Sequence, residues 1–155
     1  MNDSVSGVLF DESGHCQFCA SFYQGTNRNN IIQPEQRKKR LQQLCDEIKS
    51  NHKGKYNCII GVSGGADSSY AVYLAKQQGL RPLAVHLDNG WNSEQAANNI
   101  KHVLERLEID LHTHVIEWGE FRELQKAFLR ANVPDVELLT DHAILGVLHK
   151  VARKH

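Results

Sequence analysis

Asn57-Cys58-Ile59-Ile60-Gly61-Val62 leads directly into Ser63-Gly64-Gly65-Ala66-Asp67-Ser68-Ser69, so that a short apolar run meets a turn rich in glycine and serine. The apolar run is typical of a parallel strand that is buried on both faces. A helical pattern follows from about Asp67 to Gln78, and Gly79 ends it. The sequence therefore predicts a strand, a glycine-rich turn and a helix in immediate succession.

The same alternation continues toward the C-terminus. Further strands are expected at 82–87 and 111–116, and further helices after a cap at Asn92 or Ser93, at about 119–131 and from Thr140-Asp141 onward. This order builds a Rossmann-like α/β fold, a parallel sheet with helices on both faces. Because a helix closes the chain where a fourth strand is expected, we interpret the fold as truncated after its third strand.

The first 30 residues have little periodicity and are interpreted as an irregular arm around Cys16 and Cys19. Pro34 and Glu35 are typical of a first helical turn and predict a helix there. We therefore divide the chain into an arm at 1–30 and an α/β domain at 31–155 that carries the glycine-rich turn. Cys45 and Cys58 lie in helical and strand patterns and are interpreted as small buried side chains.

The bulk composition favours a soluble cytoplasmic protein. The 155 residues include 18 basic and 18 acidic side chains, giving a formal net charge of zero. A neutral chain argues against nucleic acid as a partner. No secretory signal is recognisable at the N-terminus, and no run approaches the roughly 20 apolar residues that span a bilayer, which argues against a membrane partner.

The glycine-rich turn has the chemistry of a phosphate-binding loop. Backbone N–H groups at a helix start bind anions, and the hydroxyls of Ser63, Ser68 and Ser69 add donors. A Walker A loop is excluded because Asp67 stands where its lysine belongs. A carboxylate beside polyphosphate is repulsive unless a cation lies between them, so we expect ATP together with Mg²⁺ here. The alternative is an aspartate that only caps a helix in a plain turn.

A second group of residues is expected at the same edge of the sheet. Ligands of parallel sheets bind beyond the carboxyl ends of the strands. The loop after the first strand and Asp88-Asn89-Gly90 after the second both lie there. Trp91 and Asn92 follow at the mouth of the site, where the tryptophan either stacks on a ligand ring or packs under the loop.

Cys16 and Cys19 form half of a structural zinc site, because such sites usually have four ligands. His15, or a cysteine pair outside this sequence, is a candidate to complete it. A redox pair and the absence of any special role are the alternatives. His112 and His114 alternate on a strand and are interpreted as structural.

The motif Ser-Gly-Gly-x-Asp-Ser after a buried strand resembles the PP-loop of the N-type ATP pyrophosphatases. The chain from about Asp11 to His155 further resembles the N-acetyl sugar amidotransferases of bacterial surface-polysaccharide biosynthesis, including lipopolysaccharide O-antigen. The segments that carry this second resemblance are 11–19, 81–94, 98–100, 113–118 and 140–144.

The resemblance implies an ATP-dependent reaction. ATP adenylates the acetamido oxygen of an N-acetyl sugar, which is expected to be nucleotide-linked, and ammonia from a partner glutaminase displaces AMP to give an acetamidino sugar. It implies that the pyrophosphate end of ATP is held by Ser63, Gly64, Gly65, Asp67, Ser68 and Ser69. It further places adenine near the backbone of His86 and Leu87, and Asp88 near the ribose or Mg²⁺.

Asp141 is a second candidate catalytic residue beside Asp67. It is expected to face the α-phosphate or the sugar amide, and its alternative role is the N-cap of the last helix. Trp91 and Asn92 are the candidate substrate contacts. Two other functions remain open, a tRNA-thiolating enzyme of the same superfamily and a non-catalytic nucleotide-binding fragment.

Overall fold

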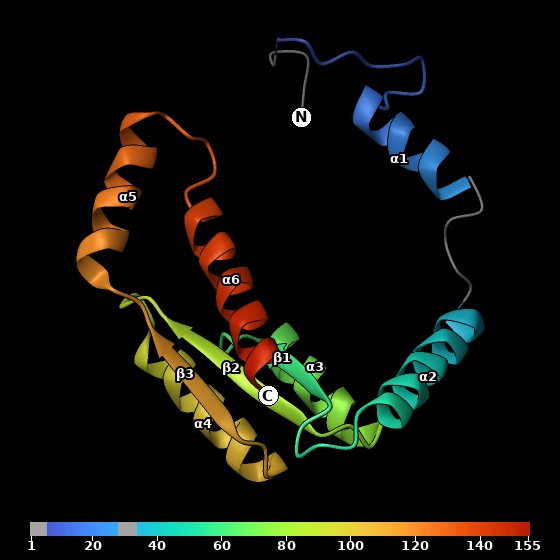
Figure 1. Cartoon of the computed structure of the whole chain (residues 1–155). Helices are drawn as coiled ribbons and strands as arrows, with labels where there is room; N and C mark the ends of the chain where they lie inside the picture. Colours follow the sequence, from blue (N-terminus) through green and yellow to red (C-terminus); the bar gives the residue numbers. More distant parts are fainter. Residues whose placement is uncertain (1–5, 28–33) are drawn as a thin grey trace. The chain divides into compact units, whose positions relative to one another are not determined.

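Three parallel strands form the sheet of this protein, whose computed structural model describes residues 6–27 and 34–155. The strands are β1 (Cys58–Gly61), β2 (Pro82–Asp88) and β3 (Leu111–Val115), in the spatial order β1-β2-β3 (Figure 1). The register pairs Ile60 with Ala84, and Ala84 with Leu111. All three strands lie in a compact unit from Gln43 to His155, and a second unit ends at Gln42.

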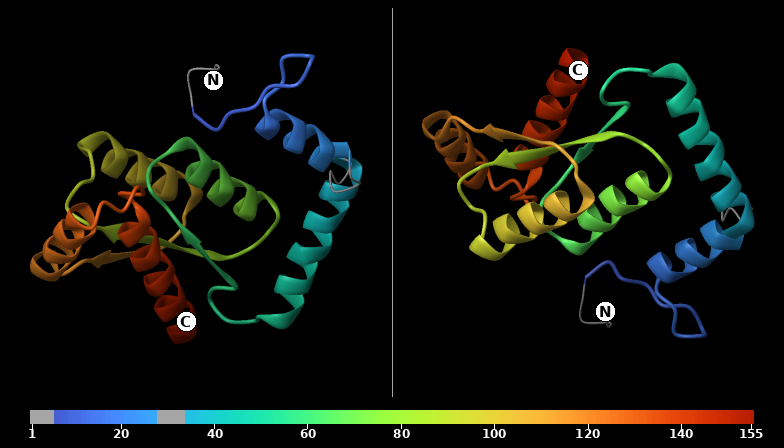
Figure 2. Two further views of the ribbon diagram at one scale, coloured as in Figure 1. Left: turned by 90° about the horizontal axis from the view of Figure 1, so that it is seen from above. Right: turned by 90° about the horizontal axis from the view of Figure 1, so that it is seen from below.

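The central strand β2 is buried on both faces because its side chains alternate between two cores. Leu83, Val85 and Leu87 pack with Val147 and Val151 of the last helix, α6 (Leu138–Lys154). On the opposite face Ala84 packs with a cluster from α3 (Ala66–Gln77) and α4 (Glu94–Leu107). Figure 2 shows these layers, with α3 and α4 on one face of the sheet and α6 on the other. The predicted fold class is confirmed.

The helices from α4 onward confirm the predicted order of elements and show one difference. Ser93 caps α4, since its hydroxyl accepts a 3.1 Å hydrogen bond from the Ala96 N–H. The fifth helix, α5 (Trp118–Arg130), ends before Asn132, whose φ is +52°. The last helix begins at Leu138, with Glu137 in the cap position. The alternative of Asp141 as N-cap is therefore wrong, because the helix starts earlier and places Asp141 within its first turn.

A helix also forms in the N-terminal segment, where an irregular arm was expected. This helix, α1 (Gln17–Asn27), follows a turn closed by the bridge between Phe10 and Cys16. The sequence pattern failed here because the large side chains of α1, among them Phe18 and Phe22, are exposed and form no buried stripe. The predicted boundary after residue 30 lies outside the described residues.

The next helix, α2 (Pro34–Asn51), begins at Pro34 as predicted. Its Cys45 is buried against Ala75 and Leu80, and Cys58 of β1 is half-buried beside them, so both thiols pack as small apolar side chains. In the described parts of the chain, no helix combines the length and the apolarity that a bilayer crossing requires.

Glu117 caps α5 and makes the stability of this helix start dependent on pH. Its carboxylate accepts hydrogen bonds from the backbone N–H groups of Glu120 and Gly119, at 2.6 and 3.1 Å, and these bonds lower the pKa of Glu117. A lowered folded-state pKa stabilises the fold above the unfolded value and loses that effect as the pH falls.

We therefore expect Glu117→Ala to lower the melting temperature at pH 7, and we expect this loss to shrink as the pH falls and the wild-type cap becomes protonated. Circular dichroism melts between pH 7 and pH 3 measure this difference. Glu120→Ala is the matched control, because it leaves the capping carboxylate and both N–H donors in place. An equal loss at both pH values would contradict the cap.

Candidate functional site

The predicted phosphate-binding loop connects the end of β1 to α3 and requires glycine at one position. Gly64 has a φ of +80°, a conformation that other residues rarely adopt. A Cβ atom on Gly64 would lie 2.8 Å from the Cα of Ala96 in α4. The backbone of the loop is therefore packed directly on the first turn of α4.

The helix start after the loop presents donors toward the edge of the sheet. Gly65 stands at the N-cap position of α3 in an extended conformation, and no side chain caps the helix there. The first N–H groups of a helix have no acceptor within the helix itself. Together with the helix dipole, such free N–H groups favour an anion, so the geometry is compatible with the predicted phosphate-binding loop, which stays a prediction.

The three serines of the loop have different partners. The hydroxyls of Ser63 and Ser68 lie 3.2 Å apart, and the N–H of Ser63 also donates to the Ser68 hydroxyl at 3.2 Å. The Ser68 and Ser69 hydroxyls both donate to the carbonyl of Gly65, at 3.3 and 2.8 Å. Asp67 is exposed in the first turn of α3. The loop thus brings Ser63 and Ser68 together beside the helix start, and the hydroxyls of Ser68 and Ser69 both stabilise the turn.

A cavity of about 330 Å³ adjoins the loop. We call it the nucleotide cavity, after the ligand expected from the sequence, and its lining consists of Gly61, Val62, Ser63, Val85, His86, Leu87, Asn89, Asn92, Thr140 and Ile144. His86 Nδ1 lies 2.9 Å from the carbonyl oxygen of Val62. Since a carbonyl only accepts, Nδ1 carries the hydrogen of this bond. His86 therefore joins β2 to the end of β1, and both His86 and Leu87, the predicted adenine contacts, border the cavity.

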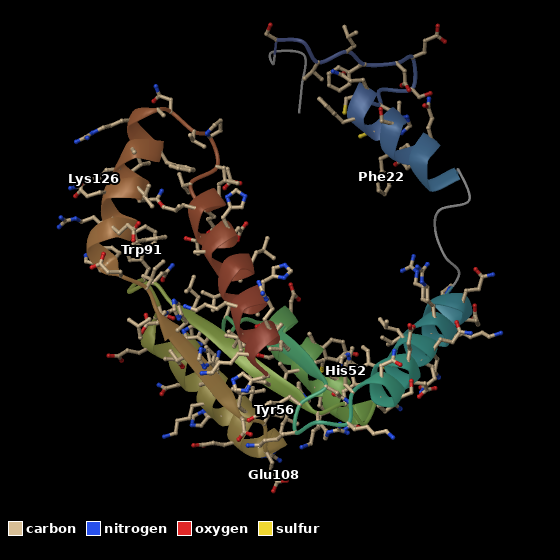
Figure 3. All side chains as sticks on the ribbon, viewed as in Figure 1. Phe22, His52, Tyr56, Trp91, Glu108 and Lys126 are labelled. Carbon is tan, nitrogen blue, oxygen red and sulfur yellow. The ribbon has the colours of Figure 1, made fainter. Side chains whose placement is uncertain are left out.

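Asp88 organises the turn that follows β2. Its Oδ1 accepts 3.0 Å hydrogen bonds from the Gly90 N–H and from the Asn92 side chain. Trp91 lies beside the start of α5 (Figure 3) and is 57% exposed, with its ring 5.9 Å from that of Trp118 and 5.8 Å from that of Phe121. Trp91 thus packs on an aromatic cluster at one edge and exposes more than half of its surface.

A larger cavity of about 550 Å³ lies between α5, α6 and the turn after β2. We call it the acceptor cavity, and its lining consists of Asn89, Trp91, Asn92, Gln125, Leu129, Val136, Glu137, Thr140, Asp141 and Ile144. Four of these residues, Asn89, Asn92, Thr140 and Ile144, also line the nucleotide cavity. The structure thus brings the predicted substrate contacts Trp91 and Asn92 together with Asp141, and it places the nucleotide cavity beside them.

Sequence reasoning missed two residues of this site. Asn99 of α4 donates a 3.1 Å hydrogen bond from Nδ2 to the carbonyl of Gly64. Gln125 of α5 is only 7% exposed. The sequence offered little signal for either residue. Asn99 is a polar residue of α4 directly before the buried Ile100, and Gln125 stands four residues after the buried Phe121 on the same helix face.

We expect Asn99→Ala to weaken ATP binding several-fold with little change in melting temperature, because it releases the Gly64 carbonyl without disturbing the core. Displacement of a fluorescent ATP analogue measures the affinity. The neighbouring Asn98→Ala, at another exposed position of α4, is the matched control. If both variants bind ATP like the wild type, Asn99 does not position the loop.

The Cys16 and Cys19 pair lies at the start of α1 with its sulfurs 3.6 Å apart. A hydrogen bond from the backbone N–H of Cys19 lowers the pKa of Cys16, and the sulfur–sulfur hydrogen bond raises the pKa of Cys19. Within residues 6–27 and 34–155 no third metal-ligating side chain gathers with them. His15, the candidate ligand, instead lies 3.8 Å from Asp11. His112 and His114 are both half-buried on β3.

Comparison with known proteins gives the family of this chain. The NAD synthase family model matches residues 37–136, more than half of the chain. An uncharacterized protein of Methanocaldococcus jannaschii is 36% identical over 78 residues, covering 50% of this chain and 28% of that protein. A probable mitochondrial tRNA-specific 2-thiouridylase 1 of Caenorhabditis elegans is 27% identical over 112 residues, covering 62% of this chain and 29% of the relative.

Among solved structures, the NMN synthetase of Francisella tularensis matches with a TM-score of 0.52 and 25% identity, covering 78% of this chain and 50% of the other. The present chain thus spans less than a third of these two curated relatives and half of the matched structure. The residues matched by the family model include β1, the glycine-rich loop and the turn after β2. This chain belongs to the NAD synthase family, within the PP-loop ATP pyrophosphatases.

Proposed function

We propose that this chain forms the nucleotide-binding part of an ATP-dependent amidotransferase that converts the acetamido group of an N-acetyl sugar into an acetamidino group, in bacterial surface-polysaccharide biosynthesis. The observation that carries the proposal is the junction of two cavities. One reaches Ser63 and the PP-loop, the other is bordered by Trp91 and Asp141, and they share four lining residues. A nucleotide in the first cavity and a sugar in the second would meet at Asn92 and Thr140.

The loop residues would hold the pyrophosphate end of ATP. Backbone N–H groups of α3 and the hydroxyls of Ser63 and Ser68 donate to phosphate oxygens, and Ser69 keeps the turn closed. Mg²⁺ fits this site, because the exposed Asp67 carboxylate would otherwise repel the polyphosphate, and a second carboxylate, Asp88, ends the neighbouring strand β2. When bound, the ion would neutralise charge on the phosphates. The edge of β2 at His86 and Leu87 would accommodate adenine.

The reaction we propose has two steps. The acetamide oxygen attacks the α-phosphorus of ATP, an O–P bond forms, and the bond to the leaving pyrophosphate breaks. Ammonia then adds to the activated carbon, the C–O bond breaks, AMP leaves, and a proton lost from nitrogen passes to solvent. Asp141, which borders the acceptor cavity, is proposed to hydrogen-bond the amide N–H during this attack. A glutaminase partner would supply the ammonia.

The test is release of AMP and pyrophosphate by the purified chain in the presence of Mg²⁺, ATP, ammonium and individual N-acetyl sugars, free and nucleotide-linked. Sugar-dependent release that stops in the Asp67→Ala variant supports the proposal. Release that no sugar increases overturns it. Binding of ATP without any release supports the alternative of a non-catalytic nucleotide-binding chain.

A tRNA-modifying enzyme is the second candidate, because curated relatives include the 2-thiouridylase and a tRNA(Ile)-lysidine synthase of Chlamydia pneumoniae. The formal net charge of zero argues against it, since nucleic-acid affinity comes largely from basic surfaces. Salt-dependent binding of tRNA in a filter assay would favour this candidate over the sugar.

We propose that the Cys16 and Cys19 pair binds a zinc ion. Tetrahedral zinc with Zn–S bonds of about 2.3 Å places two sulfurs about 3.8 Å apart, close to the 3.6 Å observed. Two further ligands are needed to complete such a site. Metal analysis of the purified protein tests this, with loss of bound zinc expected in the Cys19→Ser variant and an equal zinc content in both proteins as the contrary result.

A further inference from the structure

We propose that the free edge of β1 takes up a further parallel strand, formed by the segment that follows α6, and that this strand supplies a wall of the ATP site. The position of the strand is argued from the sheet alone. Its role at the ATP site rests on the proposed function, because that role assumes that the PP-loop holds ATP.

The strand that leads into the PP-loop lies at an edge of the sheet. β1 pairs with β2 on one side, and none of the described residues forms a strand on its other side. Every second N–H and C=O of a strand points to the same side, so half of the polar backbone groups of β1 point away from β2. The sequence of β1, Cys58-Ile59-Ile60-Gly61, contains neither a charge nor a proline that would block pairing at this edge. The edge is therefore a template for another strand.

A cavity of about 450 Å³ lies between β1 and α6. We call it the edge cavity, and its lining consists of His52, Tyr56, Asn57, Cys58, Ile59, Leu145, Leu148, His149, Ala152 and His155. None of the residues of β2, all of which are described, lines it. Leu145 of α6 is 55% exposed in this cavity, although α6 is packed closely enough that a Cβ on Gly61 would lie 3.6 Å from Leu148 Cδ1. An apolar helix face thus extends beside an unpaired strand.

The handedness of the connections favours the β1 edge over the β3 edge. The helices α3 and α4 follow β1 and β2 and lie on one face of the sheet, whereas α6 lies on the other face (Figure 2). Connections between parallel strands are right-handed in nearly all proteins. With helices on the first face the sheet grows from β1 toward β3, so a connection through α6 on the opposite face returns toward β1. The strand that α6 leads into therefore lies beside β1.

The end of α6 lies where such a strand has to start. The ring of His155 is 5.8 Å from the ring of Tyr56, which stands just before β1, so α6 ends beside the start of β1 (Figure 1). A segment that leaves α6 at this point can run parallel to β1 and cover Leu145. The present chain covers only half of the matched NMN synthetase structure, so that protein has residues for further strands.

The added strand would change the position of the PP-loop in the sheet. β1 connects to α3 on one face, and the added strand would be reached through α6 on the other face. Between two strands of this kind a crevice opens beyond their carboxyl ends, and ligands of parallel sheets bind there. Ser63 and Gly64 lie at that end of β1. Side chains at the carboxyl end of the added strand would therefore border the loop on the side away from His86.

Hydrogen exchange of the β1 amides, measured by NMR, tests the position of the strand. The protein is prepared as residues 1–155 and from a reading frame that continues past His155. We expect the β1 amides that do not bond to β2 to exchange rapidly in residues 1–155 and about a hundredfold more slowly in the longer protein. If the shorter chain does not fold, NOE contacts between these amides and residues after His155 decide the question.

Three outcomes would overturn the position of the strand. The first is a gene that ends at the codon of His155. The second is equal exchange of the β1 amides in both forms, and the third is a new strand that pairs with β3 instead.

Leu145→Asp tests the edge cavity independently. We expect it to lower the melting temperature of the longer protein by several degrees, because the added strand would bury Leu145, and to change residues 1–155 little. Leu124→Asp is the matched control, since Leu124 of α5 is 43% exposed, and it should change neither form. An equal effect of Leu145→Asp on both forms contradicts burial by an added strand.

Displacement of a fluorescent ATP analogue tests the role at the ATP site. We expect the longer protein to bind ATP about tenfold more tightly than residues 1–155, and Leu145→Asp to remove this gain. If the strand forms and the affinity is unchanged, its role at the ATP site is wrong and its position stands. If neither form binds ATP, the proposed function fails, and hydrogen exchange still decides where the strand lies.

Discussion

Gly64→Ala is expected to abolish ATP binding, lowering the affinity by about a hundredfold or more, because alanine fits neither the backbone conformation nor the space at this position. The φ of +80° is strained for any residue with a Cβ, and that atom would lie 2.8 Å from the Cα of Ala96. Either the loop or α4 must then move, and the donors at the start of α3 move with it. Displacement of a fluorescent ATP analogue measures the loss.

Gly65→Ala is the control for Gly64→Ala. Gly65 has an ordinary φ of −79°, and a Cβ there would meet only the Ser63 hydroxyl, at 3.5 Å. We expect this variant to retain a helix start and to bind ATP far better than Gly64→Ala. Circular dichroism of both variants separates a local change in the loop from unfolding. Similar affinities in two folded variants would show that the left-handed conformation of Gly64 is not needed.

Asp67→Asn is expected to change the affinity for ATP in opposite directions in the presence and in the absence of Mg²⁺. With Mg²⁺, loss of the carboxylate should weaken binding about tenfold, because an ion ligand is removed. With a chelator present, the same substitution should strengthen binding, because it removes a negative charge beside the polyphosphate. Titrations with and without Mg²⁺ measure both signs.

Glu105→Gln is the control for Asp67→Asn, since this exposed carboxylate of α4 lies in an ion pair with Lys101. It should behave like the wild type in both titrations. If Asp67→Asn weakens binding equally with and without Mg²⁺, the aspartate contacts ATP or the loop in another way and does not hold the ion.

The strand, loop and helix around Ser63 were predicted from sequence to within a residue or two, because their signals are local. The apolar run of β1, the glycines of the turn and Gly79 after α3 each act on their immediate neighbours. The contacts that fix the loop are not local. The hydrogen bond from Asn99 to Gly64 spans 35 positions, and no periodicity reveals it.

Sequence patterns could not predict the acceptor cavity for a similar reason. Its wall depends on how α5 packs on α6 and on the turn after β2, so that Trp91, Gln125 and Asp141 meet only in the folded chain. The helix at Gln17–Asn27 was missed because its aromatic side chains are exposed and its pattern lacks a buried face. The roles assigned to the individual site residues stay predictions.

Calorimetric titration of the folded chain with inorganic pyrophosphate and Mg²⁺ tests the central claim most directly, because pyrophosphate carries the part of ATP that the loop is proposed to hold. We predict saturable binding of pyrophosphate, competition with ATP, and loss of both in Gly64→Ala but not in Gln125→Leu. A silent titration with a chain that circular dichroism shows to be folded, or ATP binding that pyrophosphate does not displace, would contradict the assignment of Ser63–Ser69 as the pyrophosphate-binding loop.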